Sequence, residues 1–248
     1  MYNFYIIIPC YNESNRLDIN QFLQFSQQHE NYKILFVNDG SRDNTLDILK
    51  KLSATSENIS FINSKTNMGK SHAVRYGILT ILENYNTSNT YIGFLDADLS
   101  ISTTDIDQLY KTALLQPKLD FLYYMKNKRE YYKKKMFRSF ISNVLNRMNK
   151  ILYNIDIQDT QCGCKIFKSE IAKIVFKENF RSKWLFDLEI FLRLMRRYEK
   201  KLFNDLTIGI NNDNIKYAEK SKIKTTIFFQ LTFDYLNIYL GYIRKKSI

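Results

Sequence analysis

Glycine, proline, cysteine and histidine are all scarce in this chain. Its 248 residues include 7 Gly, 2 Pro, 3 Cys and 2 His. Three cysteines cannot form a disulfide framework for a chain of this length, and the Cys162–Cys164 pair has no histidine beside it to complete a zinc site. The composition therefore excludes a small disulfide-rich fold, disfavours a zinc centre and predicts reduced thiols.

The sequence also shows no secretory leader and no long apolar run. No basic segment followed by an apolar stretch and a small-residue cleavage site stands near Met1. The apolar run Phe4–Ile8 is too short to cross a bilayer. The longer segment Thr225–Ile243 is interrupted by the polar residues Gln230, Asp234 and Asn237. Because burying such groups in lipid is costly, we expect a domain over residues 1–224 and a surface-lying amphipathic helix over residues 225–248.

Positive charge is in excess. The chain carries 37 Lys and Arg against 25 Asp and Glu, a net charge of +12, which favours anionic partners. Seven of the cations lie between Lys126 and Arg138, with Glu130 as the only acid among them. This segment could bind a phosphate-bearing acceptor, adhere to anionic lipids, or remain solvated. No signature of a nucleic-acid-binding protein accompanies the charge, so nucleic acid is not an expected partner.

Apolar and helical segments alternate along the first half of the chain. Short apolar runs, typical of buried strands, cover residues 4–9, 33–38, 59–63, 91–95 and 120–124. Helical stretches between them cover residues 18–28, 45–53, 70–84 and 104–115. The alternation predicts an α/β fold with a mostly parallel, Rossmann-like sheet flanked by helices. Beyond it we expect helices at 136–153, 170–176 and 184–197, a polar turn at 158–163, a strand at 206–210 and a loop at 211–224.

Polar side chains follow the first two predicted strands, where open parallel sheets bind ligands. Pro9 closes the first strand, and Tyr11 and Glu13 follow it with a flat ring and a hydrogen-bond acceptor for a nucleoside. Asp39 ends the second strand before the turn residue Gly40. Each of these segments could equally be an ordinary strand-to-helix loop.

Two further motifs favour a diphosphate. Lys70 follows a glycine at a predicted helix start, which suits an anion, although the spacing is not that of a P-loop. Asp96 and Asp98 follow the fourth strand. Two carboxylates at the end of a buried strand are costly without a cation, and a hard divalent ion that bridges a diphosphate provides one. The pattern favours a Mg²⁺ or Mn²⁺ site.

Four motifs stand in order along the chain: Pro9–Glu13, Asn38–Asp43, Asn67–Lys70 and Asp96–Ser100. Together they resemble the inverting glycosyltransferases of family 2, whose fold is called GT-A. Two later motifs, Asp159–Lys165 and Trp184–Glu189, resemble those of the dolichyl- and polyprenyl-phosphate sugar transferases, particularly the dolichyl-phosphate β-glucosyltransferase branch. The resemblance covers residues 4–224.

This resemblance implies a role for each motif. The nucleoside and nucleotide would be held by Pro9, Tyr11, Glu13, Asp39 and Lys70. The metal and diphosphate would be held by Asp96 and Asp98. The catalytic residues and the sugar and acceptor pocket would be provided by Asp98, Gln161, Asp187 and Glu189. An acceptor phosphate would be bound by Lys126, Arg138, Ser221 and Lys222. Two positions depart from the family: Asn38 stands where an aspartate is usual, and Lys126 replaces an arginine, so that a point charge replaces a bidentate grip.

Two hypotheses about the acceptor follow. In the first, a glucose- or mannose-type hexose passes with inversion from a UDP- or GDP-hexose to a polyprenyl phosphate, at the cytoplasmic face of a membrane. A phosphate monoester is already ionised near neutral pH, so it needs cations such as the segment Lys126–Arg138 rather than a base. In the second, the acceptor is a hydroxyl of a surface polysaccharide or lipid-linked glycan, and Asp187 or Glu189 removes its proton. The absence of a spanning run within these residues favours the second.

Overall fold

The computed structural model describes residues 2–28, 31–126, 147, 150, 162–183, 185–198, 203, 207–212 and 225–244. All statements below concern these residues.

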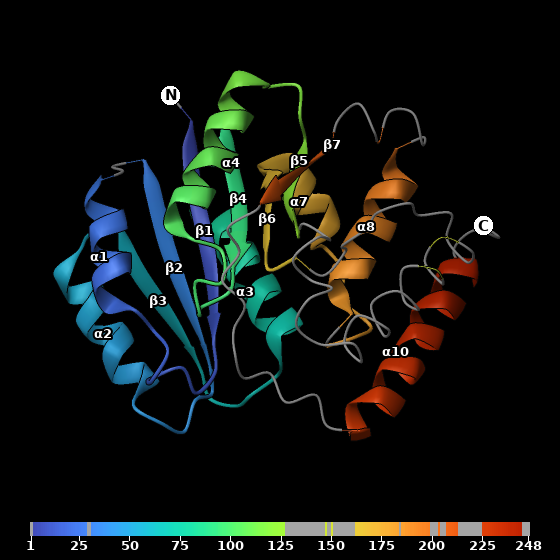
Figure 1. Cartoon of the computed structure of the whole chain (residues 1–248), viewed down its shortest axis with the longest axis horizontal. Helices are drawn as coiled ribbons and strands as arrows, with labels where there is room; N and C mark the ends of the chain where they lie inside the picture. The colour runs from blue at the N-terminus through green and yellow to red at the C-terminus, as the bar shows by residue number, and fades with distance from the viewer. Residues whose placement is uncertain are drawn as a thin grey trace.

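A seven-stranded sheet lies at the centre of the described structure, in the order β3-β2-β1-β4-β6-β5-β7 (Figure 1). Its strands are β1 (Asn3–Cys10), β2 (Tyr32–Asp39), β3 (Ile59–Ser64), β4 (Thr90–Leu95), β5 (Phe121–Lys126), β6 (Cys164–Lys168) and β7 (Thr207–Asn212). β1 pairs in parallel with β2 and β4, as do β2 with β3 and β5 with β7. β6 runs antiparallel to both of its neighbours, β4 and β5. The sheet is therefore mostly parallel, as the sequence predicts.

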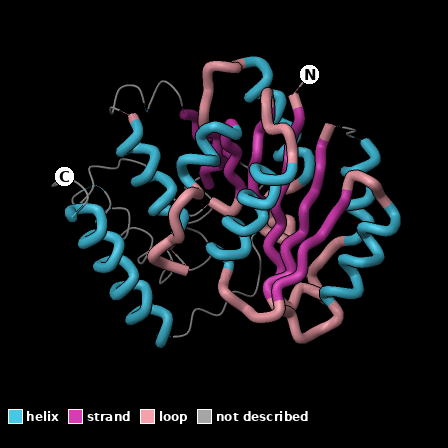
Figure 2. Tube along the Cα trace, turned by 180° about the vertical axis from the view of Figure 1, so that it is seen from behind, coloured by secondary structure: helices cyan, strands magenta, loops and turns pink. Residues whose placement is uncertain are grey.

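Helices cover both faces of this sheet (Figures 1 and 2). They are α1 (Ile19–Gln28), α2 (Thr45–Thr55), α3 (Lys70–Asn84), α4 (Thr103–Leu115), α7 (Ser169–Val175), α8 (Phe186–Arg197) and α10 (Thr225–Arg244). One core cluster joins the sheet to α1, α2 and α4, and the other joins it to α3, α7, α8 and α10. In β1, Phe4, Ile6 and Ile8 belong to the first cluster, whereas Tyr5 and Ile7 belong to the second. This alternation follows from the two-residue period of a strand, and it explains why β1 is apolar throughout.

The sequence correctly predicts the strands of the first half and the helices between them, but it misses β6. The segment Cys164–Lys168 contains Lys165, whose side chain is fully buried, so its apolar pattern is broken at the middle of the strand. The expected helix at 136–153 lies almost entirely outside the described residues. The expected loop at 211–224 begins two residues too early, because residues 211 and 212 end β7, and the rest of it lies outside the described residues.

Helix α10 packs onto the face of the sheet that carries α8. Tyr235 and Ile238 of α10 are each 2% exposed and belong to the core cluster on that side. Among the described residues, no helix is long and apolar enough to cross a membrane. Residues 225–244 therefore form a helix with one of its sides buried against the rest of the protein.

Candidate active site

The polar strand-end motifs meet at one edge of the sheet, because the carboxyl ends of parallel strands lie side by side. This is the lower edge in Figure 1, where β1, β2 and β4 end. Pro9 is half-buried at the second-last position of β1, where it is in register with Val37 of β2. Tyr11 follows with 40% of its surface exposed, so that its ring is accessible to a ligand.

Glu13 lies in the loop after β1 and has one carboxylate oxygen without a partner. Its Oε1 forms an ion pair with Arg16, while its Oε2 is buried and accepts no hydrogen bond from any described residue. Burial raises the pKa of Glu13, Arg16 opposes this rise, and the charges of Asp98 and Asp96 add to it. Glu13 therefore lies within electrostatic range of the pair after β4, and its buried oxygen can accept a hydrogen bond from a bound ligand.

Asp39 is buried at the end of β2 and connects this strand to the loop before α3. Its two carboxylate oxygens accept hydrogen bonds from the backbone N–H groups of Met68 and Gly69, at 2.9 and 2.8 Å. Gly40 has a φ of 67°, and a Cβ atom there would lie 2.6 Å from the backbone of Thr66. Only glycine fits this approach without strain. Asp39 therefore fixes the start of α3, where Lys70 is the first residue.

Lys70 connects the loop before α3 to the Asp96 carboxylate. The Lys70 Nζ lies 2.5 Å from the Asp96 Oδ1, and the two side chains are about one third exposed (35% and 32%). Burial alone would lower the pKa of Lys70, but the carboxylates of Asp96, Asp187 and Asp98 raise it above the ordinary lysine value. Lys70 is thus a cation held beside the first carboxylate of the pair after β4.

The loop after β4 is held in a tight conformation. Asp98 accepts a hydrogen bond from the backbone N–H of Ser100 through Oδ1, and Leu99 has a φ of 48°. A branched residue in the left-handed region costs about 1–2 kcal/mol, and such strain is typical of functional loops. Ser102 then begins α4 with a capping box to Asp105, which fixes the far end of the loop.

β6 brings a second segment against Asp96. Because β6 is antiparallel to β4, its first residue, Cys164, pairs with Leu95, the last residue of β4. The backbone N–H of Asp96 donates to the carbonyl of Gly163 at 3.1 Å. A Cβ atom on Gly163 would lie 2.7 Å from Cγ of Asp96, so this position accommodates no side chain without displacing the carboxylate.

Asp187 forms a buried ion pair with Lys165. The Lys165 Nζ donates to the Asp187 Oδ1 at 2.7 Å and to the carbonyl of Cys162 at 2.6 Å. The side chain of Lys165 is 0% exposed and that of Asp187 is 7% exposed. Burial raises the pKa of Asp187, and the positive charges of Lys165 and Lys70 counteract it. Asp187 is thereby placed on the Lys70 side of the site.

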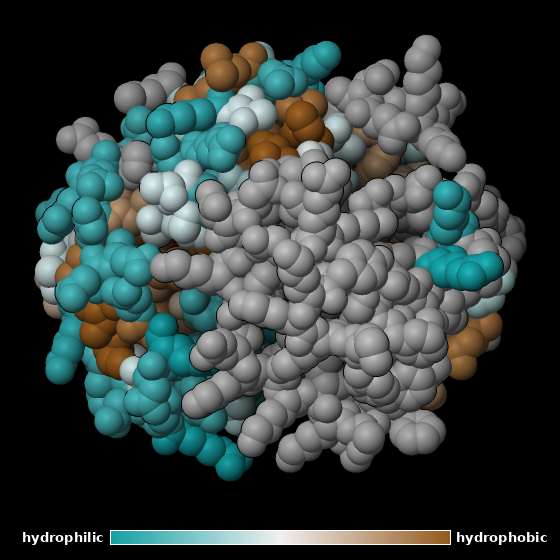
Figure 3. Space-filling model, viewed as in Figure 1, coloured by the Kyte–Doolittle hydropathy of each residue, from teal (hydrophilic) through white to brown (hydrophobic). Residues whose placement is uncertain are grey.

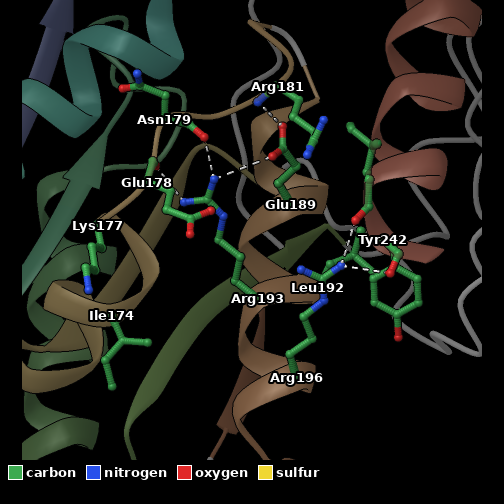
Figure 4. A pocket seen from close by; sticks show the side chains of 12 residues that line it. Ile174, Lys177, Glu178, Asn179, Arg181, Glu189, Leu192, Arg193, Arg196 and Tyr242 are labelled. Carbon is green, nitrogen blue, oxygen red and sulfur yellow. Dashed lines mark hydrogen bonds and ion pairs between the residues drawn. The ribbon is translucent and has the colours of Figure 1, made fainter. Parts of the chain in front are cut away.

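Glu189 lies elsewhere. Its Oε1 accepts from the backbone N–H groups of Arg181 and Ser182, at 2.8 and 2.9 Å, and its Oε2 lies 3.6 Å from Arg193. Glu189, Arg193 and Arg196 of α8 line a cavity of about 360 Å³ together with residues of α10. Figure 4 shows Glu189 beside Arg193 in this cavity. The structure therefore brings Asp187 into the neighbourhood of the strand-end carboxylates but does not bring Glu189 there.

The remaining candidate residues cannot be placed. Gln161, Arg138, Ser221 and Lys222 lie outside the described residues, and Lys126 is described only as the last residue of β5. Conversely, Gly163 and Lys165 contact the predicted site residues although the motif analysis gave neither a role. The scarcity of glycine could have drawn attention to Gly163, and a lone lysine in an apolar run could have drawn attention to Lys165.

The mostly parallel sheet flanked by helices is the architecture of the GT-A fold, and the structural comparisons agree. The fold is similar to that of glucosyl-3-phosphoglycerate synthase from Mycobacterium tuberculosis, which was crystallised with Mn²⁺, UDP-glucose and phosphoglyceric acid. The match has a TM-score of 0.70 and 11% sequence identity, and it covers 96% of this chain and 80% of the synthase chain. The fold is also similar to that of mannosyl-3-phosphoglycerate synthase from Rubrobacter xylanophilus, with a TM-score of 0.69 and 10% sequence identity. This match covers 99% of this chain and 75% of the synthase chain.

The chain belongs to glycosyl transferase family 2, whose model matches residues 5–176. It is 28% identical over an alignment of 258 positions to a dolichyl-phosphate beta-glucosyltransferase of Trichomonas vaginalis, covering 95% of this chain and 72% of that relative. It is also 28% identical to the dolichyl-phosphate beta-glucosyltransferase of Mus musculus, covering 75% of this chain and 60% of the mouse protein. The protein is therefore a glycosyltransferase, and the family resemblance inferred from its motifs is confirmed.

Proposed function

We propose that this protein transfers a glucose- or mannose-type hexose from a UDP- or GDP-hexose to a polyprenyl or dolichyl phosphate, with inversion and with the help of Mg²⁺ or Mn²⁺. The observation that carries the donor half is the group of carboxylates at the edge of the sheet, where Glu13, Asp96 and Asp98 lie within electrostatic range of one another. The acceptor half is supported by the dolichyl-phosphate specificity in the names of the relatives.

Among the described residues no group of three or more possible metal ligands occurs, so the protein would supply two carboxylates to a hard divalent cation, which usually completes its coordination with substrate phosphates and water. Carboxylate oxygens are the ligands that Mg²⁺ and Mn²⁺ prefer, and Asp96 and Asp98 would hold the ion. Glu13 is ion-paired with Arg16 and Asp96 with Lys70, and the buried Oε2 of Glu13 accepts no hydrogen bond from a described residue. A bound cation would neutralise the diphosphate of the donor and so make it a better leaving group.

The residues of the chain contribute the rest of the reaction. Tyr11 is accessible for stacking on the base, and Lys70 can turn from Asp96 towards a phosphate oxygen because a third of its side chain is exposed. A phosphate acceptor needs no base, so the role left to Asp187 is to accept hydrogen bonds from the sugar. If the acceptor were instead a glycan hydroxyl, the same carboxylate would be the candidate base. The buried position of Asp187 beside Lys70 keeps this alternative open.

The acceptor is tested by supplying UDP-[¹⁴C]glucose or GDP-[¹⁴C]mannose with and without polyprenyl phosphate. We expect radioactivity in an organic-extractable lipid that releases the sugar on mild acid treatment, and only when both polyprenyl phosphate and a divalent cation are present. Transfer to a glycan acceptor without transfer to polyprenyl phosphate would instead support the hydroxyl alternative. An enzyme fully active in excess chelator would contradict the metal assignment.

We also propose that helix α10 attaches the protein to an anionic membrane surface. Phe233, Leu236 and Leu240 are 65, 56 and 53% exposed, and their spacing of three and four residues places them on one side of the helix. Figure 3 shows apolar side chains at the right-hand edge of the molecule, where α10 lies in Figure 1. An apolar stripe on a protein with a charge of +12 suits the surface of an acidic bilayer, where a lipid acceptor would lie.

The membrane proposal is tested with vesicles that contain anionic lipid. Exchanging Leu236 and Leu240 for glutamine should weaken vesicle binding by about tenfold or more, because each leucine contributes roughly 1–2 kcal/mol when it enters the apolar layer. The matched control is Leu115→Gln on α4, which removes a leucine that is 83% exposed but lies outside the stripe. Equal vesicle binding by all variants in a co-sedimentation assay would contradict the proposal.

A further inference from the structure

The buried lysine of β6 has no role in the proposed reaction so far. Lys165 is 0% exposed in an inner strand of the sheet, and its Nζ lies 5.4 Å from the ring centroid of Phe94 and 5.8 Å from that of Phe191. A charged side chain in such a place is costly unless it is fully paired. Structural needs alone would be met by an apolar residue of the same size, so the presence of a lysine calls for a reason.

Its contacts join the two halves of the candidate site. Through Nζ, Lys165 binds the Oδ1 of Asp187, at the start of α8, and the carbonyl of Cys162, one residue before the glycine that packs on Asp96. The same ammonium therefore holds the backbone segment that lies against Asp96 and the carboxylate that lies near Lys70. Among the described residues, Lys165 is the only one that donates a hydrogen bond to Asp187, and it uses Oδ1 alone.

We propose that Lys165 is a positioning residue for sugar transfer: it orients the Asp187 carboxylate so that Oδ2 remains available to the substrates. This inference rests on the proposed function, in which Asp187 contacts the sugar or the acceptor. Lys165 itself touches no substrate, because its ammonium is enclosed by Asp187, the Cys162 carbonyl and two aromatic rings.

A double-mutant cycle tests this inference. Lys165→Met keeps an unbranched side chain beside the rings but removes the charge, and Asp187→Asn removes its partner. We expect Lys165→Met to lower kcat at least about tenfold while KM for the nucleotide sugar changes less than about threefold, because the donor contacts remain. We expect the double variant to be no less active than Asp187→Asn alone, because Lys165 acts through Asp187.

Lys168→Met is the matched control. Lys168 lies three residues further along β6 and forms an ion pair with Asp120 at 2.9 Å, outside the candidate site. Loss of the Lys168–Asp120 ion pair should leave kcat within about twofold of wild type, since surface or half-buried ion pairs of this kind contribute little to the free energy of folding. A Lys165→Met enzyme as active as the control would overturn the inference, as would a double variant clearly less active than Asp187→Asn.

Two further outcomes are separable. If Lys165→Met leaves an unpaired buried carboxylate and does not fold, the comparison between the double variant and Asp187→Asn still decides, because neither contains that carboxylate. If the wild-type enzyme transfers sugar to no polyprenyl phosphate, the proposed acceptor is wrong. The same cycle measured with a glycan acceptor then tests the role of Lys165, since its contacts with Asp187 do not depend on the acceptor.

Discussion

Asp98→Asn is expected to lower sugar transfer by about a thousandfold. This corresponds to about 4 kcal/mol of transition-state stabilisation, at about 1.4 kcal/mol for each factor of ten, and it is within the range expected when a metal-binding carboxylate is lost. Asp98 is a better target than Asp96 because its carboxylate accepts a hydrogen bond from the N–H of Ser100, whereas the Asp96 carboxylate is ion-paired with Lys70 and the Asp96 backbone binds Gly163. An asparagine can keep the contact with Ser100, so the loop should retain its shape.

Calorimetry separates loss of metal binding from loss of structure. Wild-type protein should bind a nucleoside diphosphate more tightly when Mn²⁺ is present, and Asp98→Asn should abolish that difference. Asp47→Asn is the matched control, because it removes the same charge from an exposed pair on α2 and should leave both binding and turnover unchanged. Cation-dependent binding that survives in Asp98→Asn would mean that the donor site has been placed wrongly.

The donor half of the site could be predicted from the sequence because it depends on parallel strands. Residues that follow β1, β2 and β4 must lie along one edge of the sheet, whatever the loops between them do. The positions of Glu13, Asp39 and Asp96 at the ends of these strands therefore predict that the three residues lie along the same edge of the sheet. What the pattern could not predict is that Asp39 already accepts two backbone hydrogen bonds from the loop before α3.

The sugar and acceptor half was harder to predict, for two physical reasons. β6 is antiparallel and carries a buried lysine, so neither the strand alternation nor its apolar pattern indicates it. Asp187 and Glu189 form a pair in the sequence, but two residues on a helix differ by about 200° around its axis. They therefore point to opposite sides of α8, one towards Lys165 and the other towards the loop at Arg181. Because the sequence predicts the helix that became α8, its periodicity alone places Asp187 and Glu189 on different sides of that helix.

The second large effect is expected from Gly163→Ala, which adds a single methyl group to the site. The new Cβ would lie 2.7 Å from Cγ of Asp96, well inside van der Waals contact. Asp96 cannot move without loosening its ion pair with Lys70 or its backbone hydrogen bond to Gly163. A displacement of about 1 Å in a reacting group can lower the rate by about a hundredfold, and we expect kcat to fall by that factor.

Gly77→Ala distinguishes a displaced carboxylate from general overpacking. Gly77 lies on α3, where a Cβ atom would approach Val37 to 2.9 Å and also collide with Ile7 in the core. This variant should lose about 1–3 kcal/mol of unfolding free energy but keep its kcat at low temperature. Gly163→Ala should show the reverse, because the Asp96 side chain is one third exposed and can yield towards solvent at little cost in stability. Thermal unfolding and steady-state kinetics on both variants measure this contrast. If Gly163→Ala retains wild-type turnover, the position of the Asp96 carboxylate does not limit the reaction.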